Sequence, residues 1–207
     1  MVEPLIAEPD SWPAPPEPDR IIVLRGVTWA DYQRLLEIRA DAAVPRITYL
    51  QGVLELMSPS KTHEILKSMI GRLVEAWCTE RGVDITPFGS WTLESKESER
   101  GAEPDECYVL GTPGDEDRPD LAIEVIWTSG GLAKLEVYRK LRVAEVWLWR
   151  AGRIEVHALR GEQYEQVARS EVLPDLDLAE LLRFVDVRPM TRAVREYREL
   201  LRGGPAV

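Results

Sequence analysis

Residues 120–149, DLAIEVIWTSGGLAKLEVYRKLRVAEVWLW, decide the fold of this chain. The run at 120–127 is short and almost continuously apolar, which is typical of a strand in the centre of a sheet. The segment TSGG ends that strand, LAKLEVYRKL at 132–141 predicts one short helix, and AEVWLWR at 144–150 predicts a second strand. A strand, a crossover helix and a strand indicate an α/β protein.

Strands and helices also alternate on both sides of this unit. A hairpin is expected at 46–57 around Gln51–Gly52, and helices are expected after the N-cap Thr28 and at 62–82, where Gly82 is the stop. The other expected elements are strands at 20–24, 83–94, 104–111, 153–160 and 161–170, a loop at 94–103, and helices at 177–185 and 189–202. We therefore predict one mixed central sheet flanked by helices, with helical additions at the N-terminal and C-terminal ends.

Length and composition predict a single domain with an N-terminal arm. The 207 residues are somewhat more than a typical domain of roughly 150. Residues 1–19 contain five acidic residues and no basic one, and residues 3–19 contain six of the 15 prolines. We interpret 1–19 as an extended, acidic arm that carries no chemistry, and 20–207 as one domain.

Composition also excludes several classes of protein. Two cysteines without C-x-x-C spacing and two histidines exclude a zinc ribbon or finger. The chain has no apolar run of membrane-spanning length and no signal-like start, so a cytoplasmic location without membrane contact is expected. The net charge of −10 argues against coating nucleic acid through charge alone.

Glu124 is the first candidate for chemistry, because it lies inside the apolar run LAIEVIW. A carboxylate there must face solvent, form an ion pair or bind a metal. Asp105, at the start of a neighbouring predicted strand, would supply the second carboxylate of a Mg²⁺ site, whereas Asp120 is better interpreted as a turn residue. Lys134 opposes the dipole of its predicted helix, which suggests a nearby anion, although a solvated lysine is the alternative. Tyr138 would share its face.

Two further polar residues have open interpretations. His63 falls in the first turn of the helix expected at 62–82, where a surface position is the alternative to a functional one. Glu55 lies among apolar neighbours in the expected hairpin, where it could simply face solvent. Trp147 and Trp149 alternate on one strand and are expected to be core or interface aromatics.

Three strings follow one another along the chain in this order: GVLELMSPSKTHE, then PD, then PDLAIEVIWTSGGLAKLEVYRKLRVAEVWLW. Through these strings the chain resembles the Uma-two family of putative restriction endonucleases, in the PD-(D/E)XK nuclease superfamily. The resemblance covers about residues 46–159. It implies a restriction-endonuclease-like core, in which Asp105 matches the acid of the PD element and Glu124 matches the (D/E) position. The motif lysine would stand at 126, where this chain has Ile126, and Lys134 is the migrated substitute.

On this basis we expect a metal-dependent endonuclease acting on DNA. Asp105 and Glu124 would hold Mg²⁺, with Mn²⁺ as another suitable ion and the Val125 carbonyl as a further ligand. Lys134 would act on the water or the phosphate, and His63 would lie at the rim of the site.

Two rival functions remain at this point: a nuclease fold that binds nucleic acid or assembles without cutting, and an enzyme acting on another phosphate ester. Glu55 matches a position that looks typical of the family branch, with no derived role. A homodimer is the expected assembly.

Overall fold

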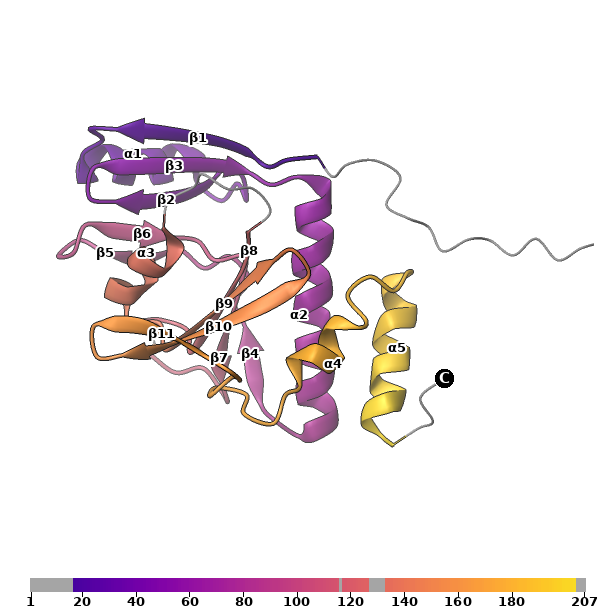
Figure 1. Ribbon diagram of the computed structural model, residues 1–207. Coiled ribbons are helices and arrows are strands. Elements are labelled where there is room, and N and C mark those ends of the chain that lie inside the picture. Colours follow the sequence, from indigo (N-terminus) through magenta and orange to yellow (C-terminus); the bar gives the residue numbers. More distant parts are fainter. Residues whose placement is uncertain (1–16, 116, 127–132, 204–207) are drawn as a thin grey trace, which may run out of the picture.

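The computed structural model describes residues 17–115, 117–126 and 133–203, and the structural statements below concern this part of the chain. Figure 1 shows one β-sheet above another, with a long helix along one side. The strands are β1 (Arg20–Arg25), β2 (Arg46–Leu50), β3 (Val53–Ser58), β4 (Ile85–Pro87), β5 (Leu93–Ser95), β6 (Arg100–Ala102), β7 (Glu106–Leu110), β8 (Leu121–Val125), β9 (Glu145–Arg150), β10 (Arg153–Arg160) and β11 (Gln163–Val167). The helices are α1 (Trp29–Arg39), α2 (Lys61–Arg81), α3 (Lys134–Leu141), α4 (Leu178–Leu182) and α5 (Met190–Leu201).

The larger sheet, here called sheet B, contains the unit from which the sequence analysis started. Its strand order is β11-β10-β9-β8-β7-β4. β8 and β9 are parallel, and the other neighbouring pairs are antiparallel. α3 follows β8 and precedes β9 in the chain, as a parallel pair requires of its connection. The predicted α/β class, with helices flanking a mixed sheet, is confirmed.

The smaller sheet, here called sheet A, has the order β1-β3-β2-β6-β5 and is antiparallel throughout. β2 and β3 form the hairpin expected at 46–57. Its turn residues Gln51 and Gly52 have φ values of 42° and 87°, the positive pair that suits the twist of a two-residue hairpin turn. This hairpin brings the residues of two strands onto one face that points toward sheet B.

The described part of the chain forms two sheets, whereas we expected a single mixed sheet. β4 pairs with β7 in sheet B, whereas β5, later in the segment expected as one interrupted strand, pairs with β6 in sheet A. β6 lies in the expected loop at 94–103 and pairs with β2. Its three residues include Gly101 and carry no apolar alternation, so local pattern could not reveal a strand that exists through non-local pairing.

The two faces of sheet B bury different helices. Leu121, Ile123 and Val125 pack in the cluster that contains the apolar face of α2. Ala122 points the opposite way and packs with Val137 and Tyr138 of α3. Glu124 shares the face of Ala122, because alternate residues of a strand face the same side. Trp147 and Trp149 belong to the first cluster, which confirms them as core aromatics.

Both ends of α2 are capped, the C-terminal one by Gly82 as predicted and the N-terminal one by Ser60, which we did not predict as a cap. The Ser60 hydroxyl accepts a hydrogen bond from the backbone amide of His63 at 3.2 Å, which satisfies one of the free amides of the first turn. Gly82 ends the helix in the left-handed region with φ at 66°. α2 therefore begins directly beside the candidate site. None of the helices in the described ranges is long and apolar enough to cross a membrane.

Candidate functional site

The candidate site lies where sheet A faces the start of β7 and the end of β8. Glu106 of β7 pairs with Ile123 of β8, so the antiparallel register puts the preceding residue, Asp105, across from Glu124. Residues opposite each other in an antiparallel pair project toward the same face. Asp105 is fully buried and Glu124 is 1% exposed. The register thus brings together the two acids that the sequence analysis singled out.

Asp105 is held by contacts from three elements. Its Oδ2 accepts a hydrogen bond from the Val125 amide at 2.6 Å and lies 3.0 Å from Nε2 of His63. Its Oδ1 forms an ion pair with Arg46 of β2. A fully buried carboxylate needs such compensation, because an isolated charge is very costly to desolvate. Val125 thus contacts the site through its amide, whereas its carbonyl as a metal ligand stays a prediction.

Glu124 is held by α3. Its Oε1 accepts a short hydrogen bond from the hydroxyl of Tyr138 and lies 3.5 Å from Nζ of Lys134. Burial, together with the negative charge of Glu124, raises the pKa of Tyr138 well above its ordinary value, so the phenol stays protonated and remains a donor. Lys134 and Tyr138 are one helical turn apart, and both reach Glu124, as their spacing suggested.

Lys134 links the two sheets. It is the first residue of α3, it is 8% exposed, and its ammonium group donates to the hydroxyl of Thr48 at 3.0 Å. Thr48 pairs in register with Glu55 across the β2–β3 hairpin, which puts both side chains on the face that points toward sheet B. Glu55 is 2% exposed, so the solvent-facing interpretation of this residue is wrong.

His63 lies between two carboxylates. Its Nδ1 is 2.9 Å from Oδ2 of Asp19, and its Nε2 contacts Asp105. The ring is fully buried, so the expected position at the rim is wrong. An imidazole between two carboxylates orients both of them through its ring nitrogens. His63 therefore supports the position of Asp105.

Asp19 belongs to the site, although we placed it in an arm without chemistry. Burial alone would raise its pKa, but the hydrogen bonds from His63 and from the Ser60 amide, the latter at 2.8 Å, outweigh burial and lower the pKa below its usual value. Asp19 stays ionised and ties the chain before β1 to the start of α2.

Two functional candidates were missed by sequence reasoning. Arg46 is 4% exposed and bridges Asp105 to Glu64, whose Oε1 is 2.9 Å from Nη2. Arg46 and Thr48 are two residues apart on β2, so alternation in the predicted hairpin could have grouped them with Glu55. Asp19 carried no such signal, because it follows a proline-rich stretch without periodicity.

The ligand atoms offered by the site fit a hard cation. Mg²⁺ is commonly held by one or two carboxylates, and water and phosphate oxygens complete its shell. Within the described ranges, the contacts to Glu124 fall on Oε1, which leaves Oε2 as the atom for a ligand bond. In the same ranges no three His, Cys, Asp or Glu side chains form a group that could hold a metal by themselves. A metal held by Asp105 and Glu124 would thus take most of its ligands from water and substrate.

Comparisons with known proteins agree with this fold. The family model described as putative restriction endonuclease, Uma2, matches residues 29–190. Among solved structures, a putative nuclease of the family DUF820 from Anabaena variabilis is similar, with a TM-score of 0.52 and 14% sequence identity. The similarity covers 68% of this chain and 92% of that one. No curated protein matches. Because the family model spans most of the chain, this protein belongs to the Uma2 family of putative restriction endonucleases.

Proposed function

We propose that this protein hydrolyses phosphodiester bonds in DNA with a divalent cation, Mg²⁺ or Mn²⁺, held by Asp105 and Glu124. The observation that carries the proposal is the placement of these two buried carboxylates across from each other, with the ammonium group of Lys134 at 3.5 Å from Glu124. Metal-assisted attack of water on a phosphodiester needs oxygen ligands that hold the metal ion. It also gains from a positively charged side chain beside the phosphate, and the two carboxylates and the ammonium group supply these groups. Membership of a nuclease family points to the same chemistry.

Each residue of the site then has a separate task. The bound cation would polarise the scissile phosphate and lower the pKa of the attacking water. Asp105 and Glu124 would bind that cation, with the Val125 carbonyl as a further oxygen. Lys134 stands in for the lysine that is absent at Ile126, and it would orient the water or stabilise the negative charge that develops on phosphate.

Arg46, His63 and Tyr138 act as positioning residues in this proposal. Arg46 and His63 fix the two oxygens of Asp105, and Tyr138 fixes Oε1 of Glu124. Carboxylates that are held before the substrate arrives need less reorganisation in the reaction. Glu55 shares a face with Thr48, the hydrogen-bond partner of Lys134, and we propose it as a further acid at the site.

A second candidate function is a nuclease fold that binds nucleic acid without cutting it. The contacts of Asp105 favour this alternative, since both of its oxygens are already occupied by Arg46, His63 and the Val125 amide. A cation would have to share or displace these partners. Ile126 in place of the motif lysine points the same way.

Nicking of a supercoiled plasmid separates the two functions. We expect the wild-type protein to nick the plasmid with Mg²⁺ or Mn²⁺ and not with EDTA, and the Asp105→Asn variant to be inactive. A gel-shift assay with the same DNA supplies the second readout. If the wild-type protein binds DNA but does not cut it with either ion, the non-cutting function holds and the hydrolytic one is wrong.

A further inference from the structure

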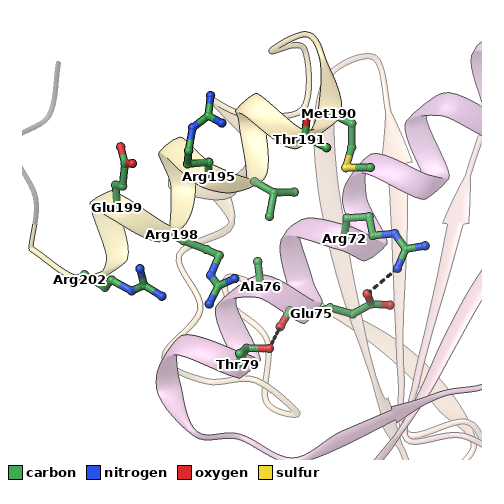
Figure 2. Close-up of a pocket in the computed structure, with 11 residues that line it drawn as sticks. Arg72, Glu75, Ala76, Thr79, Met190, Thr191, Arg195, Arg198, Glu199 and Arg202 are labelled. Carbon is green, nitrogen blue, oxygen red and sulfur yellow. Dashed lines mark hydrogen bonds and ion pairs between the residues drawn. The ribbon is translucent and has the colours of Figure 1, made fainter.

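A groove lies between α2 and α5 and is lined by both charged and apolar side chains. The groove has a volume of about 460 Å³. Ala76, Val194 and Met190 give it an apolar floor. Its charged lining consists of four arginines, Arg72, Arg195, Arg198 and Arg202, and two glutamates, Glu75 and Glu199. Figure 2 shows that the labelled side chains come from both helices, with Ala76 and Arg198 between them and the guanidinium group of Arg195 pointing away from α2.

The arginines are not all neutralised by the protein itself. Arg198 and Arg202 both pair with Glu80, and Arg72 pairs with Glu75. Arg195 is exposed and forms no ion pair with any residue in the described ranges. The four arginines of the groove outnumber its two glutamates, so the groove carries a small excess of positive charge in a chain whose net charge is −10. An occupant with both carboxylates and apolar side chains would match the rim and the floor at once.

The chain itself contains a segment with that chemistry. Residues 1–16 hold Glu3, Glu8 and Asp10, no lysine or arginine, and several apolar side chains, among them Leu5 and Trp12. This segment leads into residue 19, whose carboxylate is bound at the first turn of α2. It therefore starts at the end of the helix that forms one wall of the groove.

The distances allow the segment to reach the groove. From Ser60 to Arg72 and Thr79, α2 extends by about 18 Å and about 28 Å, at 1.5 Å per residue. Residues 1–16, which are rich in proline, span up to about 50 Å if extended at 3.1 Å per residue. Figure 1 shows α5 beside α2, with the start of β1 near the N-terminal end of α2. The groove is thus within reach of a tethered segment.

We propose that residues 1–16 dock in the groove between α2 and α5, with their carboxylates against its arginines and their apolar side chains on Ala76, Val194 and Met190. Tethering makes this an intramolecular event with an effective concentration in the millimolar range for a short linker, so weak contacts suffice. The five prolines of residues 1–16 lower the conformational entropy that docking removes.

A nitroxide spin label on the full-length Glu8→Cys variant tests the proposal by NMR. Cys78 and Cys107 are buried, so the spin label should attach to the introduced thiol and not to these two cysteines. Amide signals of residues 72–79 and 190–202 should lose most of their intensity, and the loss should diminish in high salt. Adding Arg195→Glu should abolish the loss, whereas Arg153→Glu, at an exposed position on β10, should not.

Three results would overturn the proposal. The first is signal loss confined to other elements, or no loss at all. The second is a signal loss that appears only in a mixture of two samples, one spin-labelled without ¹⁵N and the other ¹⁵N-labelled without the spin label. That result would make a second copy of the protein the occupant. The third is a groove that remains unaffected by the label but shifts on addition of a DNA duplex, which would assign the arginines to phosphate contacts.

Discussion

Lys134 is a buried cation, and we predict that its removal affects both chemistry and stability. We predict that Lys134→Met reduces Mg²⁺-dependent nicking by orders of magnitude, because no other ammonium group contacts Glu124 within the described ranges. The variant should also lose about 3 kcal/mol in the free energy of unfolding, because it leaves a buried carboxylate without its cation.

Nicking rates and urea unfolding measure the two effects of Lys134→Met. Lys140→Met is the matched control, since this lysine lies on the same helix but pairs with Glu162 at the surface. Wild-type nicking by the Lys134 variant would show that the migrated-lysine assignment is wrong.

Tyr138 offers a more selective test at the same scale. Tyr138→Phe removes the hydrogen bond to Glu124 and keeps the buried ring, so the cost to stability should be about 1.5–3 kcal/mol. Because Glu124 loses the group that orients it, titration calorimetry should also show weaker Mg²⁺ binding. Tyr164→Phe removes a hydrogen bond to the Val143 carbonyl, which lies between α3 and β9, and should leave Mg²⁺ binding unchanged. Equal affinity in the wild type and Tyr138→Phe would contradict the positioning role.

At the scale of elements, β6 joins sheet A through a close approach that only glycine permits. A Cβ at Gly101 would lie 2.0 Å from the hydroxyl oxygen of Tyr32, which is fully buried on α1. We predict that Gly101→Ala destabilises the protein by about 3 kcal/mol or more, because the ring cannot move without disturbing its stack on Tyr49. Thermal unfolding measures this, and an unchanged midpoint would mean that α1 and β6 do not pack as described.

The stabilisation that Asp19, just before β1, gains from its contacts at the start of α2 should depend on pH. Asp19 has a lowered pKa in the folded state, so it stabilises the fold above its unfolded pKa and loses that effect as pH falls through the folded pKa. The difference in unfolding free energy between the wild type and Asp19→Asn should be constant above about pH 5 and shrink below the ordinary value of 3.8. A difference that grows on acidification would contradict the assigned contacts.

Across the whole molecule, patterns within one segment were predictable and pairings between distant segments were not. The hairpin turn at Gln51–Gly52, the caps of α2 and the parallel pair around α3 follow from local signals. The division into two sheets depends on β6 pairing with β2, which no local pattern encodes. The same distinction holds for the site. Glu124 is conspicuous as a charge in an apolar run and Asp105 as an acid at the start of a neighbouring predicted strand, whereas Asp19 joins the candidate site only through a partner 44 residues away.

The assembly of the molecule is a further prediction. β1 is the edge strand of sheet A, and Ile22, Val23 and Leu24 are 58%, 38% and 41% exposed. An apolar edge strand readily pairs with another strand, so we expect a homodimer through β1. Light scattering should give twice 23.5 kDa, and Val23→Lys should give the monomer. A wild-type mass of 23.5 kDa at micromolar concentration would remove the dimer.

The central claim is that Asp105 and Glu124 share one cation. Crystals grown with Mn²⁺ and measured at an energy where manganese scatters anomalously test this most directly. We predict one anomalous peak between the two carboxylates, close to Oε2 of Glu124, at roughly 2.1–2.2 Å from the ligand oxygens by analogy with Mg²⁺. A peak elsewhere, or none at this site in crystals that contain the ion, would contradict the claim.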